Sequence, residues 1–204
     1  MTSFQIKVLA ALLMVVDHIG LILFPHYLIF RYMGRLSFPL FAWLIGQGEK
    51  YTKNFKSYTL RLIVAAIISQ PVYHALFKFN DLNILVSLLI GLLAIRVGKL
   101  TKYKYLTWLT FAAIAQTINA NYGLYGILVI TTLSEFSRNN TNWWFKWVLV
   151  NLLVFLPVGL NSYQIIAMLT PLIIMLWNGK QGKKSKFLYF FYPLHLAVIK
   201  ALAN

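Results

Sequence analysis

The stretch Val8–Phe24 reads VLAALLMVVDHIGLILF, an apolar run that is interrupted only by Asp17 and His18. A helix of this length can cross the hydrocarbon core of a bilayer. An ionisable side chain in hydrocarbon costs at least about 2.5–3.5 kcal/mol, so such residues are usually paired and functional. The stretch therefore predicts a membrane-spanning helix that carries a candidate functional site.

The composition of the whole chain extends this prediction. Of 204 residues, 60% are hydrophobic and 11% are charged, whereas a soluble domain has about 25% charged residues. Apolar runs recur along the whole length, so their surface cannot be hidden in one globular core. We expect an all-α, polytopic transmembrane helical bundle that forms a single domain over residues 1–204 and is surrounded by membrane lipids.

The charge and the residue counts exclude several classes of site. A net charge of +15 would point to nucleic acid in a soluble protein, but here the basic residues lie between apolar runs and we expect no nucleic-acid partner. The chain has no cysteine, which rules out a thiolate nucleophile. The four histidines are scattered and lack metal-ligand spacing, and no phosphate-binding loop motif is present. We therefore expect neither a metal site nor a nucleotide-binding loop.

The apolar runs predict about nine spans, within a range of eight to ten, because several runs are short for a hydrocarbon core of about 30 Å. The predicted spans are Phe4–Phe24, Arg31–Gly48, Tyr58–Phe77, Asn83–Gly98, Lys104–Ile118, Tyr122–Ser137, Trp143–Pro157, Ser162–Asn178 and Lys186–Ala203. The loops between them are short, which leaves no room for a soluble domain.

The basic residues predict the orientation of these spans. With the N-terminus in the cytoplasm, Lys7 and the loops after the second, fourth, sixth and eighth spans hold 15 of the 19 lysines and arginines. Positive residues are concentrated on the cytoplasmic side of membrane proteins. We therefore expect a multi-pass protein with a cytoplasmic N-terminus.

The polar residues that orientation does not explain gather toward the external half of the spans. Many of them, such as Asn80, Asn119 and Asn121, have an ordinary explanation, because the ends of spans are polar. Four residues lie deeper and are the candidate catalytic residues: Asp17, His18, Arg35 and His195.

Asp17 and His18 point about 100° apart on a helix, so Asp17 is poorly placed to orient His18. A carboxylate inside the membrane still needs a partner. At about 1.5 Å per residue, Asp17 and Arg35 lie about 10 Å and about 6 Å below the outer ends of their helices. We therefore predict an ion pair between Asp17 and Arg35. It either keeps Asp17 ionised and leaves His18 free as a base, or only fixes the packing of the helices.

His18 is the candidate general base, because a neutral imidazole can take a proton from an amine or hydroxyl that attacks a carbonyl. Lys7 lies on nearly the same helix face, about 16 Å away along the axis. Lys7 and other cytoplasmic basic residues could hold the phosphates of a donor such as coenzyme A, whose arm has a comparable reach. Lipid headgroups would explain the same basic cluster. The other candidates for donor binding are Lys50, Lys53, Arg61 and Lys183.

Several motifs resemble the TraX family. The two most specific are KVLAALLMVVDHIG over residues 7–20 and GRLSFPLFAWLIGQG over residues 34–48. Further matches follow in order along nearly the whole chain: Arg61-Leu, SQPVY over 69–73, LNIL over 82–85, YGLYG over 122–126, NGK over 178–180 and YPLHL over 192–196. The spacing of Lys7 and His18 is also similar to the basic-x10-His motif of the type 3 integral-membrane acyltransferases.

The resemblance implies an acetyltransferase of the bacterial plasma membrane, with acetyl-CoA as the donor substrate. In the TraX family the acceptor is the N-terminal amine of pilin, and in the wider acyltransferase group the histidine is taken as catalytic. That role carries over to His18, with Lys7 as its basic partner. The resemblance gives no equally clear role to Asp17, Arg35 or His195, and it leaves open whether His18 or His195 is the base.

The acceptor is not encoded in the sequence. The polar external half suggests an acceptor that arrives from outside or from the outer leaflet, such as pilin, a glycan or a lipid. The alternative function is a transporter or flippase that moves an anionic substrate past Asp17, His18 and Arg35, although the chain shows no inverted repeat. A third is a structural partner of a secretion or cell-wall assembly, and the sequence leaves a homo-oligomer open.

Overall fold

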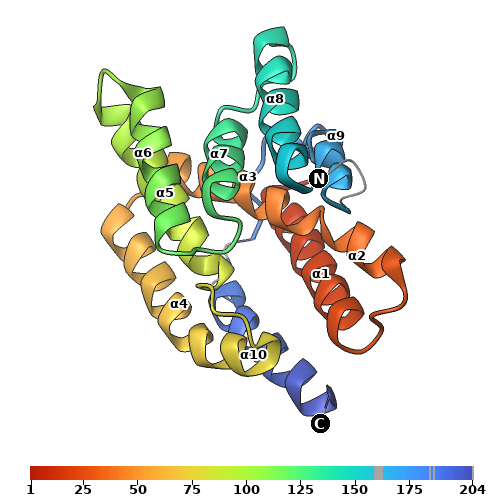
Figure 1. The fold of residues 1–204 in the computed structure, drawn as a ribbon. Helices are drawn as coiled ribbons and strands as arrows, with labels where there is room; N and C mark the ends of the chain where they lie inside the picture. Colours follow the sequence, from red (N-terminus) through yellow and green to blue (C-terminus); the bar gives the residue numbers. More distant parts are fainter. Residues whose placement is uncertain (159–162, 184, 186, 204) are drawn as a thin grey trace.

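The structure is a computed structural model that describes residues 1–158, 163–183, 185 and 187–203. Within these residues the regular secondary structure is helical (Figure 1). The elements are α1 (Ser3–Ile22), α2 (Leu28–Gly34), α3 (Ser37–Tyr51), α4 (Phe55–Phe77), α5 (Ile84–Leu100), α6 (Lys104–Thr117), α7 (Gly123–Ser134), α8 (Thr141–Val158), the 3-10 helix η1 (Tyr163–Leu169), α9 (Thr170–Ile174) and α10 (Phe187–Ala203). The prediction of an all-α fold is confirmed.

Each of the nine predicted spans overlaps at least one helix. The helical segments long and apolar enough to cross a membrane are Ser3–Ile22, Leu28–Tyr51 and Phe55–Phe77. The shorter apolar helices are Gly123–Ser134, Tyr163–Ile174 and Tyr189–Ala203. The positions of the helices therefore match the prediction, while the number of spans and the side of the N-terminus stay predictions.

The second predicted span consists of two helices, α2 and α3, which are joined by Arg35 and Leu36. Both joining residues keep right-handed helical backbone angles, and α2 lies along α1 (Figure 1). Gly34 permits this close approach, because a Cβ at this position would lie only 2.2 Å from the Cβ of Asp17. The arrangement brings Arg31 and Arg35 to the same stretch of α1.

The start of α1 is fixed by a capping box. The Thr2 hydroxyl accepts a hydrogen bond from the Gln5 amide at 3.2 Å, and Gln5 Oε1 accepts one from the Thr2 amide at 2.8 Å. These bonds satisfy two amides that a helix start would otherwise leave free. The Ser3 amide also donates to the Lys180 carbonyl at 2.9 Å. That bond places the segment after α9 beside the start of α1.

One end of the bundle, which we call the charged end, is held by ion pairs between helix ends. Glu49 near the end of α3 pairs with Arg96 of α5 at 3.2 Å, and also with Lys99 of α5. Lys104 at the start of α6 pairs with Glu135, which follows α7, at 2.6 Å. These ion pairs join the end of α3 to the end of α5, and the start of α6 to the end of α7. The distribution of basic residues in the sequence places the same loops together on the predicted cytoplasmic side.

At the opposite end, which we call the pocket end, two loops pair through their backbones. The Leu82 amide donates to the Asn119 carbonyl and the Asn121 amide donates to the Leu82 carbonyl, both at 2.9 Å. The result is an isolated parallel bridge between Leu82 and Ala120. Backbone groups near hydrocarbon must be hydrogen-bonded within the protein. The bridge therefore gives the pocket end a fixed rim, formed by the loop before α5 and the turn before α7.

The core between the two ends is apolar, and Trp43, Leu92, Ile130 and Leu133 are almost fully buried in it. Figure 1 shows α5, α6 and α7 grouped on one side of the bundle, with α10 against α4. The last helix also contacts α1. This packing brings residues from the two extremes of the sequence to the pocket end.

Candidate functional site

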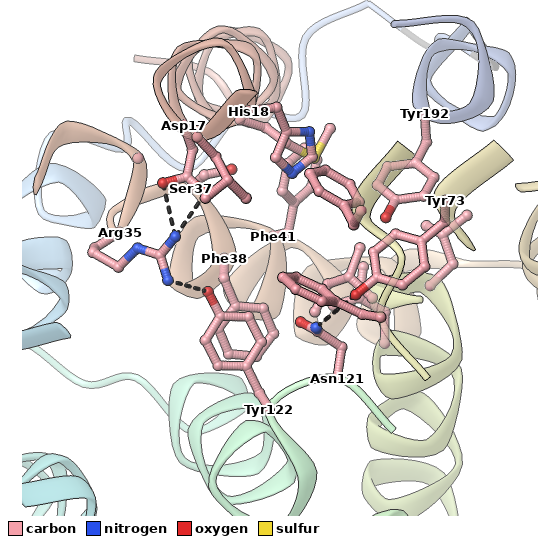
Figure 2. Close-up of a pocket in the computed structure, with 18 of the residues that line it drawn as sticks. Asp17, His18, Arg35, Ser37, Phe38, Phe41, Tyr73, Asn121, Tyr122 and Tyr192 are labelled. Carbon is pink, nitrogen blue, oxygen red and sulfur yellow. Dashed lines mark hydrogen bonds and ion pairs between the residues drawn. The ribbon is translucent and has the colours of Figure 1, made fainter. Parts of the chain in front are cut away.

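A cavity of about 280 Å³ lies at the pocket end. Its walls come from α1, α2, α3, α4, α5 and α10 and from the turn before α7 (Figure 2). Phe38, Phe41 and Phe77 form part of an apolar lining. The polar lining includes Asp17, His18, Arg31, Arg35, Ser37, Tyr73, Asn121, Tyr122 and Tyr192. A space of this size fits a small ligand or the end of a larger one.

Asp17 is held by two arginines. Arg35 Nη2 lies 2.7 Å from Asp17 Oδ1 and 2.6 Å from Oδ2 (Figure 2). Arg31 Nη1 lies 2.8 Å from Asp17 Oδ2 and donates to the Asp17 carbonyl at 3.2 Å. The three side chains are only 12–18% exposed, and buried charges must be paired. The predicted Asp17–Arg35 ion pair is therefore confirmed, and Arg31 joins it as a second cation.

Arg35 also ties this ion pair to the turn before α7. Its Nη1 donates to the Tyr122 hydroxyl at 3.2 Å. Tyr122 has a left-handed backbone, with φ of 63°, a conformation that is uncommon for residues other than glycine. Its ring stacks on Phe38 with centroids 4.3 Å apart. The stack and the hydrogen bond together hold the phenol against the guanidinium.

His18 is hydrogen-bonded to His195 of α10. His18 Nδ1 lies 2.9 Å from His195 Nε2, and His195 Nδ1 lies 2.9 Å from the Phe191 carbonyl. A carbonyl can only accept, so His195 Nδ1 carries a hydrogen, and in a neutral ring its Nε2 then accepts. His18 Nδ1 must therefore be the donor, which leaves a free lone pair on His18 Nε2. This assignment of hydrogens follows from the network.

The two rings occupy different places relative to the cavity. The His18 ring lies at the cavity wall (Figure 2) and meets the ring of Phe77 edge-on, with centroids 5.0 Å apart. His195 is 7% exposed and lies behind His18, outside the cavity lining. His18 is therefore the imidazole that can meet a ligand, and His195 is placed to set its tautomer.

A second polar group lies on another part of the wall. The Tyr73 hydroxyl donates to Asp81 Oδ1 at 2.8 Å, and Asn121 Nδ2 donates to Asp81 Oδ2 at 2.7 Å. Asn121 Nδ2 also lies 3.2 Å from the Tyr73 hydroxyl (Figure 2). Asn121, which the sequence explains as a polar span end, thus lines the cavity. Tyr73 and Asn121 offer a ligand hydrogen-bonding groups away from the arginines.

The five basic residues predicted to hold a donor do not line this cavity. Lys50, Lys53 and Lys183 are exposed, and Lys7 is partly buried. Arg61 Nη1 donates to a serine hydroxyl one turn earlier in α4, at 2.7 Å. The structure does not bring these residues together with His18, and their role in donor binding stays a prediction.

Several polar cavity residues fall outside the site residues predicted from sequence, among them Arg31, Tyr73 and Tyr122. Arg31 precedes Arg35 by four residues, a spacing that puts two side chains on one helix face. That spacing is a signal for a second cation at Asp17. Tyr122 is followed by Gly123, which also has a positive φ, but the side-chain direction in such a turn has no comparable sequence signal.

The fold and the site together define the class of protein. It is an all-helical membrane protein, with apolar segments long enough to cross a bilayer and a polar cavity built on a buried ion pair and a histidine pair. The chain belongs to the TraX protein family, which matches residues 3–203. The resemblance seen in the sequence motifs is thereby confirmed over almost the whole chain.

Two relatives are similar to this chain. A probable fimbrial assembly protein FimC, serogroup H1, of Dichelobacter nodosus is 26% identical over 233 residues, which cover 97% of this chain and 94% of the relative. An uncharacterised protein of Rickettsia prowazekii is 39% identical over 93 residues, which cover 44% of this chain and 36% of that protein. No solved structure matches the chain. The likeness to the Dichelobacter protein thus spans both the charged end and the pocket end.

Proposed function

We propose that this protein is an acyltransferase embedded in the bacterial plasma membrane. It moves an acetyl group from acetyl-CoA to an amine or hydroxyl of an acceptor in the cell envelope, with His18 as the general base. The observation that best supports this is the hydrogen-bond chain from His18 through His195 to the Phe191 carbonyl. That chain leaves a basic nitrogen free at the wall of a small cavity. Membership of the TraX family favours acetyl as the transferred group.

The reaction follows from the position of His18. As the acceptor nitrogen or oxygen attacks the thioester carbonyl, its proton passes to His18 Nε2. The bond between the carbonyl carbon and sulfur then breaks, and the same proton passes from His18 to the departing thiolate of coenzyme A. The imidazole returns to its neutral form. His195 acts through His18, because His195 Nε2 accepts a hydrogen bond from His18 Nδ1 and so keeps the lone pair of His18 at Nε2.

The donor enters from the charged end, which we assign to the cytoplasm. Lys7, Lys50, Lys53, Arg61 and Lys183 are the residues that would hold its phosphates. Lys7 precedes His18 by about 16 Å along α1, a distance that the extended arm of coenzyme A can span. The acetyl group would then reach His18 from within the bundle, on the opposite side from the acceptor.

The acceptor arrives at the pocket end, on the external side of the membrane. One relative is named a probable fimbrial assembly protein, which favours a pilin-type protein as the acceptor here. A glycan or lipid of the cell envelope offers the same nucleophiles. What these acceptors share is an amine or hydroxyl that can enter a small polar cavity beside His18.

The test uses the full chain, purified in detergent, with isotope-labelled acetyl-CoA. The wild-type protein should hydrolyse the donor slowly and transfer the label to cell-envelope material. His18→Ala should lower both rates by about 10²–10⁴-fold, the range for loss of a general base. His195→Gln should lower them less and change the pH profile, because it alters the tautomer of His18 without removing it.

His26→Ala is the matched control, since His26 is an exposed histidine outside the cavity. It should behave as wild type. Full activity in His18→Ala would overturn the role of His18. If the wild-type protein consumes no acetyl-CoA but moves an anion into proteoliposomes, the transporter interpretation replaces the enzyme.

A further inference from the structure

The cavity wall carries more positive than negative charge. Arg31 and Arg35 share the single carboxylate of Asp17, and all three side chains line the cavity. The carboxylate of Asp81 accepts hydrogen bonds from Tyr73 and Asn121, and it is not among the lining residues. One positive charge on the arginine side is therefore left without a counter-ion among the described residues.

The carboxylate of Asp17 has little capacity left for this charge. It already accepts from Arg35 Nη2 with both oxygens and from Arg31 Nη1. Arg35 Nε is buried and has no hydrogen-bond partner among the residues that the structure describes. Tyr122 accepts from Arg35 through its hydroxyl, so its own hydrogen is free to donate. The arginine side of the wall is thus rich in donors and poor in acceptors.

The arginine side of the cavity wall is therefore suited to bind an anion. The two arginine side chains are 14–18% exposed, and the Tyr122 ring that Arg35 contacts stacks on the ring of Phe38. Charge interactions are much stronger in such surroundings than in water. Hydrogen bonds from an arginine to a carboxylate or phosphate are among the strongest in proteins. The neutral tautomers of His18 and His195 do not compete for this anion.

The anion does not come from the donor of the proposed reaction. The end of acetyl-CoA that would meet His18 is an uncharged thioester, and its phosphates lie at the other end of a long arm. His18 and both arginines line the same cavity of about 280 Å³. A negative group at the arginines therefore belongs to the acceptor and lies only a few bonds from its nucleophile.

We propose that Arg31, Arg35 and Tyr122 form an anion-binding subsite for the acceptor. The preferred acceptor carries a carboxylate or a phosphate close to the amine or hydroxyl that receives the acetyl group. The subsite orients the acceptor so that its nucleophile faces His18 Nε2. This inference rests on the proposed function and names the class of substrate for the same site.

The first test measures binding without catalysis. Inorganic phosphate and acetate are added to the purified protein, with sodium chloride of equal ionic strength as the reference. The stronger probe should raise the melting temperature by at least about 2 °C. Arg31→Gln should abolish this rise, because it removes the cation that Asp17 does not need. Lys78→Gln, which removes an exposed lysine at the same end, should keep it.

The second test compares matched acceptors. Phosphoethanolamine is paired with ethanolamine, and β-alanine with propylamine, so that phosphate and carboxylate are separated. The wild-type protein should acetylate one of the charged amines with a kcat/KM at least about 10-fold above its neutral partner. Arg31→Gln should remove this preference, whereas Lys78→Gln, outside the cavity lining, should keep both the preference and the rate on the neutral amines. Tyr122→Phe, a second variant that keeps all charges, should reduce the preference in part.

The outcomes separate the two proposals. If neither anion stabilises the wild-type protein beyond sodium chloride and neutral amines react as well as charged ones, the subsite is wrong while acetyl transfer stands. If an anion stabilises the wild-type protein but not Arg31→Gln, and no acetyl-CoA is consumed, the subsite stands and the proposed function fails. Stabilisation that persists in both Arg31→Gln and Tyr122→Phe would place the anion elsewhere and overturn the inference.

Discussion

Both ends of the molecule hold an acidic side chain between two cations of a neighbouring segment, yet the two groups differ in burial. At the pocket end, Asp17 pairs with two arginines whose side chains are 14% and 18% exposed. At the charged end, Glu49 pairs with Arg96 and Lys99, whose side chains are 47% and 52% exposed. The carboxylates themselves are both buried, at 12% and 1%. The difference therefore lies in the cations.

This difference decides what each group can do. At the charged end, water surrounds the spare positive charge, so the group joins α3 to α5 and needs no further anion. At the pocket end, the spare charge lies at a cavity wall, where an unpaired ion is costly. The same arrangement of charges thus holds the fold at one end and creates a candidate binding site at the other.

Removal of the carboxylate should show the largest effect. Asp17→Asn leaves two buried arginines without a counter-charge and should reduce the free energy of unfolding by about 3–5 kcal/mol. Glu49→Gln should reduce it by only about 1–2 kcal/mol, because its cations can turn to water. Both are measured by denaturant unfolding in mild detergent. Equal losses in the two variants would contradict the distinction between the ends.

Gly34→Ala should weaken the buried ion pair without changing any charge. A Cβ at this position would lie 2.2 Å from both Cβ and Oδ1 of Asp17, so α2 must move away from α1. Overpacking of this kind costs about 1–3 kcal/mol. The same unfolding assay measures the loss, and the anion-dependent rise in melting temperature should shrink with it. Wild-type stability together with a normal response to anions would show that α2 shifts freely.

Tyr122→Phe should have a smaller effect on stability. It removes the hydroxyl that accepts from Arg35 but keeps the ring that stacks on Phe38, so we expect a loss of about 0.5–1.5 kcal/mol. The matched control is Tyr105→Phe at the charged end, where an exposed hydroxyl accepts from Lys146 at 2.9 Å. We expect no measurable loss there. The comparison fails if the control loses as much as the variant at the cavity.

Lys104→Gln should have the smallest effect. Lys104 and Glu135 are 35% and 33% exposed, and pairs of this kind contribute about 0–1 kcal/mol. The loss measured by unfolding should therefore be at most about 1 kcal/mol at low salt and smaller at high salt, because salt screens exposed charges. A loss above about 2 kcal/mol would mean that this pair, like that of Asp17, is shielded from water.

Most helix positions could be predicted from the sequence, because the helices fall in apolar runs bounded by polar loops. The Asp17–Arg35 contact could be predicted as well. Depth within the membrane leaves few partners for a buried carboxylate, and Arg35 is the deep cation of the next segment. The break between α2 and α3 could not be predicted from the sequence. Arg35 and Leu36 join the two helices, and neither residue is of a type that interrupts a helix.

The contact between His18 and His195 could not be predicted from the sequence. The two residues are 177 positions apart, and no local pattern encodes which faces of α1 and α10 meet. The position of the Tyr122 side chain in the cavity wall depends on its left-handed backbone and on its stack with Phe38. Phe38 is far from Tyr122 in the sequence, so the contact depends on tertiary packing. The sequence therefore indicates which residues are unusual, and packing decides which of them face the same space.

The adjacency of Asp17 and His18 constrains how the site can move. Turning α1 about its axis would separate His18 from His195, but it would also withdraw Asp17 from both arginines. A displacement of α10 would separate the same two imidazoles but would leave Asp17 with both arginines. The rotation of α1 about its axis is therefore fixed twice at adjacent residues, by the arginines at Asp17 and by the imidazole at His18.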